Sequence, residues 1–378
     1  MTQSNQSYQD AANANLMARN YLLRNSPLIT RPIGITSGYA LGSTMRIKLQ
    51  NYGLLTSLLF KIDCQVDIGT ATAVLSDKGP YNLIKRVRLS DYSGKTRVDL
   101  SGEMLFAINC VRRGTYYGFN NESAAAVLAS PLIPTAVGTA QNLTFYLEVP
   151  VAFDELRDLR GIISMMTGNG DMYLTIDFNS SLFTNANADS VYKGAATSTV
   201  ALTAGYAPQI NATVWQNYYL PPSVNGQSVW PALDAQCVYE LQQWFTNDNL
   251  NANSEKLIAY PVGRSVLAAY IWFINNGVCN PSTIDVSKLR QLYNGSEVAY
   301  ESDASAFLYK MRLMLNSDTR NGLIIFPSRT NPVDPQTFGN VQIGFTPTTV
   351  TNTSYPARLD VAWESMYNAG AILSSVNT

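Results

Sequence analysis

The sequence predicts an all-β protein made of two tandem modules of the same kind. Two observations predict this. Apolar and polar residues alternate in many short segments, and similar segments recur in the same order in both halves. With 378 residues, the chain also exceeds the length that a single hydrophobic core usually supports, which favours two domains.

The alternating segments indicate strands that bury one face and expose the other. They are residues 44–50, 58–66, 143–149, 172–178, 341–345 and 359–363. Clusters rich in Gly, Pro and Asn separate them and predict turns, as at 76–80 and 91–95. Many half-buried strands joined by turns and long loops are typical of β-sandwiches and jelly rolls.

Three short helices are predicted between the strands. Residues 10–24 combine Ala, Leu and Met with two arginines and stop before Pro27. Residues 154–166 begin with acidic side chains, which favour a helix N-terminus, and Gly168 follows their end. Residues 303–315 carry apolar side chains at three- and four-residue steps.

An internal repeat defines the domain organisation. The paired blocks are 44–64 with 255–275, 82–95 with 285–297, 142–150 with 321–327, 169–178 with 338–347, and 210–218 with 358–367. Chance similarity between two β-rich halves is the alternative, but the preserved order favours duplication. The predicted domains are an N-terminal helical arm (1–26), a first module (27–220), a Pro-rich linker (221–234) and a second module (235–378).

Two similar modules in one chain have a geometric consequence for assembly. A cyclic trimer would present six similar modules around its axis, and tiles with such a hexagonal outline can pack edge to edge into a shell. Obligate interfaces of this kind bury about 2,000 Å² or more. A surface rich in Asn, Ser, Thr, Gln and Tyr, with few charges, can be buried at little desolvation cost and fits this demand.

The composition excludes several classes of chemistry. The chain has no histidine, so Ser-His-Asp triads, Cys-His pairs and histidine zinc sites are impossible. Its four cysteines are far apart, and no glycine-rich nucleotide motif is present. The acidic run at Asp154, Glu155 and Asp158 is interpreted as a helix start, with a metal site as the alternative. The sequence therefore predicts no enzyme activity, no catalytic residues, no cofactor and no metal.

Charge and hydropathy also limit the expected partners. A net charge of −1 provides no field that attracts nucleic acid, so no direct binding to nucleic acid is expected. No apolar run approaches the length of a membrane-spanning helix, and the first ten residues lack the pattern of a secretion signal. The four separated cysteines predict free thiols, which suit a chain that folds in a reducing cytosol.

Several collinear stretches resemble a known family. They are 76–87 with 100–102, 143–153, 213–221 with 224–227, 338–345, and 357–359 with 367–372. In this order they resemble the double jelly-roll major capsid proteins of tectivirus-type, internal-membrane bacteriophages. The resemblance implies two eight-stranded barrels per chain and homotrimers with a pseudo-hexagonal outline. It also implies an icosahedral capsid around a membrane, with penton and minor capsid proteins as further partners.

Two sets of residues are candidates for contacts within such a virion. The resemblance places the N-terminal helix near the membrane, where its side chains would contact lipid or the base of the shell: Leu16, Met17, Arg19, Leu22, Leu23 and Arg24. The alternatives are that this helix docks on a neighbouring subunit or is an ordinary surface helix. Trp215 and Trp363 occupy similar places near the ends of the two modules and are predicted as interface anchors or as core residues.

Three other functions are alternatives to a capsid protein. A phage spike or receptor-binding β-sandwich would use similar strands and aromatic loops but would not tile. A two-jelly-roll hydrolase would require a carboxylate cluster that the sequence does not suggest. An outer-membrane barrel would require a signal peptide and regular lipid-facing strands. We therefore expect a shell-forming protein, with the spike as the alternative.

Overall fold

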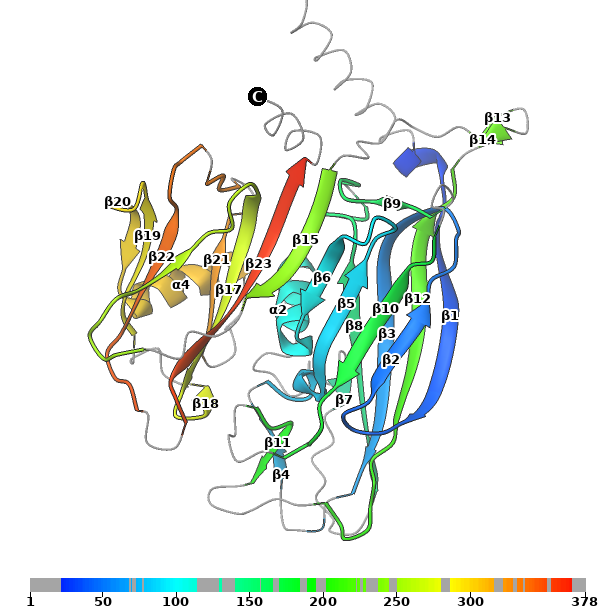
Figure 1. The fold of residues 1–378 in the computed structure, drawn as a ribbon, viewed down its shortest axis with the longest axis horizontal. Coiled ribbons are helices and arrows are strands. Elements are labelled where there is room, and N and C mark those ends of the chain that lie inside the picture. Colours follow the sequence, from blue (N-terminus) through cyan, green and yellow to red (C-terminus); the bar gives the residue numbers. More distant parts are fainter. Residues whose placement is uncertain are drawn as a thin grey trace, which may run out of the picture.

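The computed structural model describes residues 22–368, apart from 68, 70–72, 77, 114–128, 131–139, 157, 166–169, 184–188, 195–201, 222, 225–226, 229–236, 245–249, 280–285, 316–321, 329–331, 336 and 352–354. These residues form two β-barrels that lie side by side, the first on the right and the second on the left of Figure 1.

The first barrel consists of two facing four-stranded sheets with a helix at its side (Figure 1). Its main strands are β1 (Leu28–Tyr39), β2 (Thr44–Lys48), β3 (Leu54–Val66), β5 (Ile84–Ser90), β6 (Thr96–Leu100), β8 (Gln141–Pro150), β10 (Tyr173–Phe178) and β12 (Ile210–Tyr219). The smaller elements are β4 (Ala73–Leu75), the 3-10 helix η1 (Tyr81–Leu83), α2 (Gly102–Arg113), β7 (Ala129–Ser130), β9 (Ile163–Ser164) and β11 (Tyr192–Gly194).

The second barrel repeats this arrangement. A short hairpin of β13 (Ser223–Val224) and β14 (Gln227–Ser228) precedes it. Its elements are β15 (Cys237–Trp244), β16 (Lys256–Ala259), β17 (Ser265–Asn275), β18 (Val278–Cys279), β19 (Val286–Tyr293), β20 (Glu297–Ser302), α4 (Ala304–Leu315), β21 (Leu323–Pro327), β22 (Gln342–Pro347) and β23 (Arg358–Asn368).

The strand order identifies both barrels as jelly rolls. In the first barrel the order is β1-β12-β3-β8 in one sheet and β2-β10-β5-β6 in the other. In the second barrel β15-β23-β17-β21 and β16-β22-β19-β20 follow the same scheme. A helix connects the fifth strand to the sixth in each barrel, α2 in the first and α4 in the second. The chain is therefore a double jelly roll, as the sequence predicts.

The alternating pattern forms strands because each strand buries one face inside its barrel. In β3, Phe60 and Ile62 are fully buried, whereas Lys61 and Asp63, which alternate with them, are only half-buried. One hydrophobic cluster runs from the first barrel through α2 into the second barrel. The two barrels thus share one continuous hydrophobic core and do not have separate cores.

The predicted helix at 154–166 is wrong. Its acidic residues close turns instead: Asp154 Oδ1 accepts a hydrogen bond from the Leu156 N–H at 2.9 Å, and Asp158 Oδ1 accepts one from the Arg160 N–H at 3.1 Å. Side chains that favour helix N-termini also favour such turns, so the sequence signal was ambiguous.

The other helix predictions have different outcomes. The helix at 303–315 is confirmed as α4, and the Asp303 carboxylate caps it by accepting the Ala306 N–H at 2.8 Å. Helix α2 was not predicted. Residues 22–25 are helical, and the rest of the predicted N-terminal helix at 10–24 lies outside the described residues.

The strand register corrects one part of the internal repeat. The first four block pairs correspond to equivalent strands, but the fifth is displaced by one residue. A bulge lies in the strand beside each eighth strand: in β3 beside β12, and in β17 beside β23. When the two bulges are aligned, Asn217 is the equivalent of Glu364. Ala362, and not Trp363, is consequently the equivalent of Trp215. Because successive residues of a strand face opposite sides, the two tryptophans point to different faces of their sheets.

Candidate functional site

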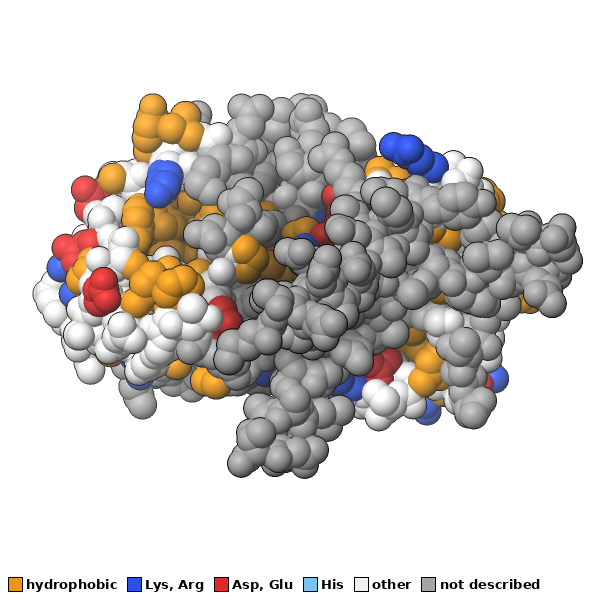
Figure 2. Space-filling view, turned by 90° about the horizontal axis from the view of Figure 1, so that it is seen from above, with side chains coloured by type: hydrophobic (Ala, Val, Ile, Leu, Met, Phe, Trp, Pro, Cys, Tyr) orange, Lys and Arg blue, Asp and Glu red, His pale blue; other side chains and the backbone are white. Residues whose placement is uncertain are grey.

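The described surface carries scattered apolar side chains among few charges. Viewed from above, Figure 2 shows several separate apolar groups, most clearly on the left, where the second barrel lies. The largest exposed fractions there belong to Val262 at 74% and to Tyr309 and Leu313 of α4 at 65% each. On the first barrel, Ile35 is 79% exposed. Exposed apolar groups of this kind are candidate contact sites for other proteins.

Polar and charged residues converge where the two barrels meet. We call this surface the barrel junction: β6, α2 and residues 76–83 of the first barrel against β15, β17 and β23 of the second. At its upper part β6 pairs in parallel with β15, with Val98 opposite Leu241 and Asp99 opposite Gln242. The Ser101 N–H at the start of α2 donates to Gln243 Oε1 at 2.7 Å. A β-sheet therefore continues from one barrel into the other.

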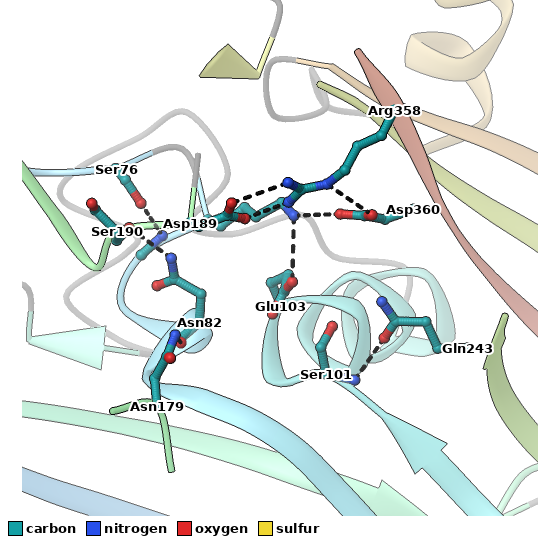
Figure 3. Close-up of polar contacts among 12 residues, drawn as sticks. Ser76, Asn82, Ser101, Glu103, Asn179, Asp189, Ser190, Gln243, Arg358 and Asp360 are labelled. Atoms are coloured by element: carbon teal, nitrogen blue, oxygen red, sulfur yellow. Dashed lines mark hydrogen bonds and ion pairs between the residues drawn. The ribbon is translucent and has the colours of Figure 1, made fainter. Parts of the chain in front are cut away.

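A buried ionic cluster crosses the junction beside the contact between Ser101 and Gln243 (Figure 3). Lys78 Nζ lies 2.8 Å from Asp360 Oδ2 on β23 and 3.5 Å from Glu103 Oε1 on α2. Arg358 Nε lies 3.3 Å from Asp360 Oδ1, and the Arg358 guanidinium also pairs with Asp189. The Lys78 side chain is only 2% exposed. One lysine of the first barrel thus binds the second barrel through a pair that water does not reach.

The cluster sets the charge states of its members. Burial alone would raise the pKa of Asp360, but the charges of Lys78 and Arg358 hold it below its ordinary value. Burial raises the pKa of Glu103, and the charge of Lys78 offsets only part of this effect. Burial would lower the pKa of Lys78, yet the carboxylates of Asp360 and Glu103 raise it. The cluster therefore favours a charged Lys78–Asp360 pair, while burial shifts Glu103 toward its protonated form.

A close backbone approach brings these side chains together. Gly102 begins α2 directly against η1, and a Cβ at this position would collide with the Tyr81 carbonyl oxygen and lie 2.8 Å from the Ile84 side chain. Glycine is therefore required for α2 to reach the loop that carries Lys78. Lys78 Nζ also lies 5.7 Å from the centre of the Trp272 ring on β17.

A second network ties α2 to the same strands. Glu364 of β23 is fully buried and accepts hydrogen bonds from Tyr239 at 2.6 Å and from Tyr270 at 3.1 Å. Arg112 of α2 donates to the Tyr239 hydroxyl at 2.9 Å and to the Ala152 carbonyl at 2.9 Å. The two networks together fix the orientation of one barrel relative to the other, because buried polar groups are costly to separate.

Sequence reasoning missed both networks. Lys78 was part of a predicted turn, and its partner Asp360 lies 282 residues away along the chain. The signal that remains in the sequence is weak: a lysine before a Gly-Pro turn, and acidic residues within otherwise apolar strands. Only the fold brings them together.

The side chains of the barrel junction make structural contacts between the two barrels. Within the described ranges, no group of three or more Cys, Asp or Glu side chains could hold a metal ion. Among the same residues, no helix is both long and apolar enough to cross a bilayer.

The structure separates the residues that were predicted for the N-terminal helix. Leu16, Met17 and Arg19 lie outside the described residues. Leu22 is fully buried with Leu54, Leu159 and Tyr219, and Leu23 packs against this small cluster. Arg24 is exposed. Leu22 therefore anchors the end of the helix to the first barrel, while Arg24 remains available for an external contact.

The two tryptophans also differ. Trp363 is 1% exposed and packs inside the second barrel with its ring centre 4.8 Å from that of Tyr260, which fits the core-packing alternative. Trp215 is half-buried on the outer face of the first barrel, in one row with Pro32 of β1 and Leu59 of β3. A role as interface anchor remains a prediction for Trp215.

Comparison with known proteins gives matches over nearly the whole chain. The family model described as P3 major capsid protein N-terminal matches residues 4–220, and the model described as P3 major capsid protein C-terminal matches residues 236–375. The major capsid protein P3 of Enterobacteria phage PRD1 is 26% identical over 392 residues, covering 96% of this chain and 95% of the relative.

Two solved structures share the fold. The STIV MCP superposes with a TM-score of 0.66 at 14% identity, covering 92% of this chain and 98% of that chain. The major capsid protein P2 from Bacteriophage PM2 gives a TM-score of 0.51 at 11% identity, covering 90% and 98%. Both similarities extend over two barrels and not over one.

Proposed function

The chain belongs to the P3 major capsid protein family, and we propose that it builds its shell from homotrimers with a pseudo-hexagonal outline. It is a viral major capsid protein, and its place is the capsid of a phage virion. Its role is structural, and we propose that it has no catalytic activity. Self-association is the shared property of such proteins, and the trimer is the specific form that we propose here.

One observation carries the trimer proposal: the two barrels have the same strand order and are held together as one body by the barrel junction. Three chains around a threefold axis would place six similar barrels in a ring. Closed rotational symmetry is the usual form of soluble oligomers, and a six-sided outline allows neighbouring trimers to pack edge to edge. The domain limits that we propose are 27–220 and 235–378 for the barrels, 1–26 for an N-terminal arm and 221–234 for the linker.

Composition supports a protein whose surface is mostly interface. Only 14% of the residues are charged, so large areas can be covered by neighbours without burying many ions. We propose that trimers contact further trimers in an icosahedral shell, that penton and minor capsid proteins complete the shell, and that the N-terminal arm faces an internal membrane. A net charge of −1 gives no support to direct binding of nucleic acid.

The trimer can be tested on the purified protein. Light scattering after gel filtration should give three times the chain mass of 41.5 kDa, and negative-stain images should show six-sided particles. A protein that remains a single chain at all accessible concentrations would refute the proposal. Discrete elongated trimers without a six-sided outline would instead favour a spike.

A further inference from the structure

The barrel junction provides an internal pattern for the contact between chains. We propose that the free edge of β20 and the outer face of α4 bind the edge of β1 and the outer face of the first barrel in a second copy of this chain. This joint would repeat the contact that β6 and α2 make with β15, β17 and β23 inside one chain. The inference rests on the proposed trimer and specifies which surfaces form it.

The surface formed by β20 and α4 corresponds residue by residue to the surface formed by β6 and α2. Leu100 of β6 pairs with Val87, and Ser302 of β20 pairs with Leu289, so the same difference of 202 in residue number relates both strands of the two hairpins. A bulge interrupts both hairpins after the third pair. The helices that follow, α2 and α4, begin at Gly102 and Ala304, which preserves this difference.

The strands on the opposite side of the joint, β1 and β15, correspond in the same way. Thr30 of β1 lies opposite Asn217, and Leu241 of β15 lies opposite Glu364. Asn217 and Glu364 each lie beside the bulge of the neighbouring strand, in β3 and in β17. Thr30 is therefore the equivalent of Leu241, and Arg31 that of Gln242.

Of these two equivalent strands, β15 is covered by the first barrel and β1 has an unpaired, exposed edge among the described residues. Leu241 of β15 is fully buried under the first barrel. Thr30, Arg31 and Pro32 of β1 are exposed, and among the described residues β1 pairs only with β12. In the same part of the chain, β20 pairs only with β19 and exposes most of its residues. Open strand edges are ready to pair with another chain.

The two helices show the same contrast. Met104, Ala107 and Ile108 of α2 are fully buried, on a helix that contacts β17 of the second barrel as well as the first barrel. Their equivalents on α4, at the same difference of 202 in residue number, are Ala306, Tyr309 and Lys310, which are all exposed. Leu313, one turn after Tyr309, is 65% exposed. The face of α4 that would meet a barrel thus faces solvent in the single chain.

The receiving face of the first barrel is also uncovered. On β17, the outward residues Tyr270 and Trp272 are buried by the first barrel. Their equivalents on β3, Leu59 and Lys61, are only half-buried. Trp215 lies next to Leu59 in the same row, at the place that Ala362 occupies beneath the first barrel. Trp215 is the anchor that this joint would bury.

Position and charge agree with a head-to-tail contact. Figure 1 places β20 at the left end of the molecule and β1 at the right end, so the two surfaces cannot meet within one chain. Transferring the pairing of Asp99 with Gln242 aligns Glu301 with Arg31 of the second copy, which joins opposite charges. Contacts of this heterologous kind close into a ring when the rotation permits, here after three chains.

Paired cysteines test the register of the joint. Oxidation of the Arg31→Cys/Glu301→Cys chain should give covalently closed trimers on a non-reducing gel, whereas each single variant stays monomeric. The matched control, Arg31→Cys/Glu297→Cys, displaces one cysteine by four residues, or about 13 Å, which is beyond disulfide reach. The four natural cysteines are buried and contribute little background.

The helix face is tested by placing a charge on it. Leu313→Asp should raise the concentration at which trimers form by about a hundredfold, because an unpaired carboxylate would be buried. Val262→Asp is the control at an equally exposed apolar residue away from the joint, and it should leave trimers unchanged. Circular dichroism should show that both variants are folded.

The outcomes separate the two proposals. Trimers that persist in the Leu313→Asp variant, together with no cross-linked trimer after oxidation of the Arg31→Cys/Glu301→Cys variant, would overturn this joint, while the trimer itself would stand. A wild-type protein that never forms trimers would overturn both. Cross-linked closed trimers together with loss of assembly in Leu313→Asp would support the joint.

Discussion

The buried pair of Lys78 and Asp360 allows a sharp test of what holds the two barrels together. Replacing Lys78 by Met retains most of the apolar stem but removes the charge that neutralises Asp360. Separating a buried ion pair costs about 3–5 kcal/mol. Arg358 remains 3.3 Å from Asp360, so we expect the lower end, about 3 kcal/mol of unfolding free energy, or roughly a hundredfold in the folding equilibrium.

Lys48 provides the matched control. Its Nζ lies 2.7 Å from Asp171 Oδ1, nearly the same distance as in the buried pair, but the two side chains are 58% and 43% exposed. Lys48→Met should therefore change stability very little, because water already solvates both groups. Urea titrations followed by circular dichroism would measure both variants. Equal losses in the two variants would refute the argument that burial makes the Lys78 pair important.

Three further predictions concern the junction and the core. Because burial raises the pKa of Glu103, its ionised form opposes folding above that pKa. Glu103→Gln should thus be at least as stable as the wild type at neutral pH, with the difference vanishing below the ordinary carboxyl pKa in a pH series of urea titrations. Gly102→Ala should lower the unfolding free energy by about 1–3 kcal/mol through overpacking against Tyr81, whereas Gly34→Ala, whose nearest neighbour would lie at 3.5 Å, should change it little. Burial raises the pKa of Cys64 to about 12, and all four cysteines are buried, so a thiol reagent should label the protein only after unfolding; rapid labelling of the native protein would contradict this.

The strands were predictable because their physical cause is local. Alternation in β3 and β10 reflects one buried and one open face, and the sequence shows that pattern directly. Helix α2 escaped prediction for a different reason: Met104, Leu105, Phe106 and Ala107 form a short continuous apolar run, and such a run does not distinguish a buried helix from a buried strand.

The ionic cluster of the barrel junction could not be predicted from the sequence, because its residues meet only in the folded chain. Lys78, Glu103 and Asp360 are each common residues in unremarkable local sequence, and their meeting depends on the packing of the first barrel on the second. The one-residue displacement of the fifth repeat block has a similar origin. A bulge in the neighbouring strand sets the register there, and bulges leave little trace in a hydropathy pattern.

Helices α2 and α4 differ in the polarity of their outer faces, because the face of α2 is covered when the chain folds and the face of α4 only when chains assemble. The outer face of α2 is buried as soon as the chain folds, so Met104 and Ile108 on that face are free to be apolar. The outer face of α4 is open in a single chain, and an equally apolar surface there would drive non-specific association. Its mixture of Tyr309 and Leu313 with Lys310 tolerates water and still provides anchors. A duplicated barrel can thus use one joint twice, permanently within the chain and conditionally between chains, by changing the polarity of the joint and keeping its geometry.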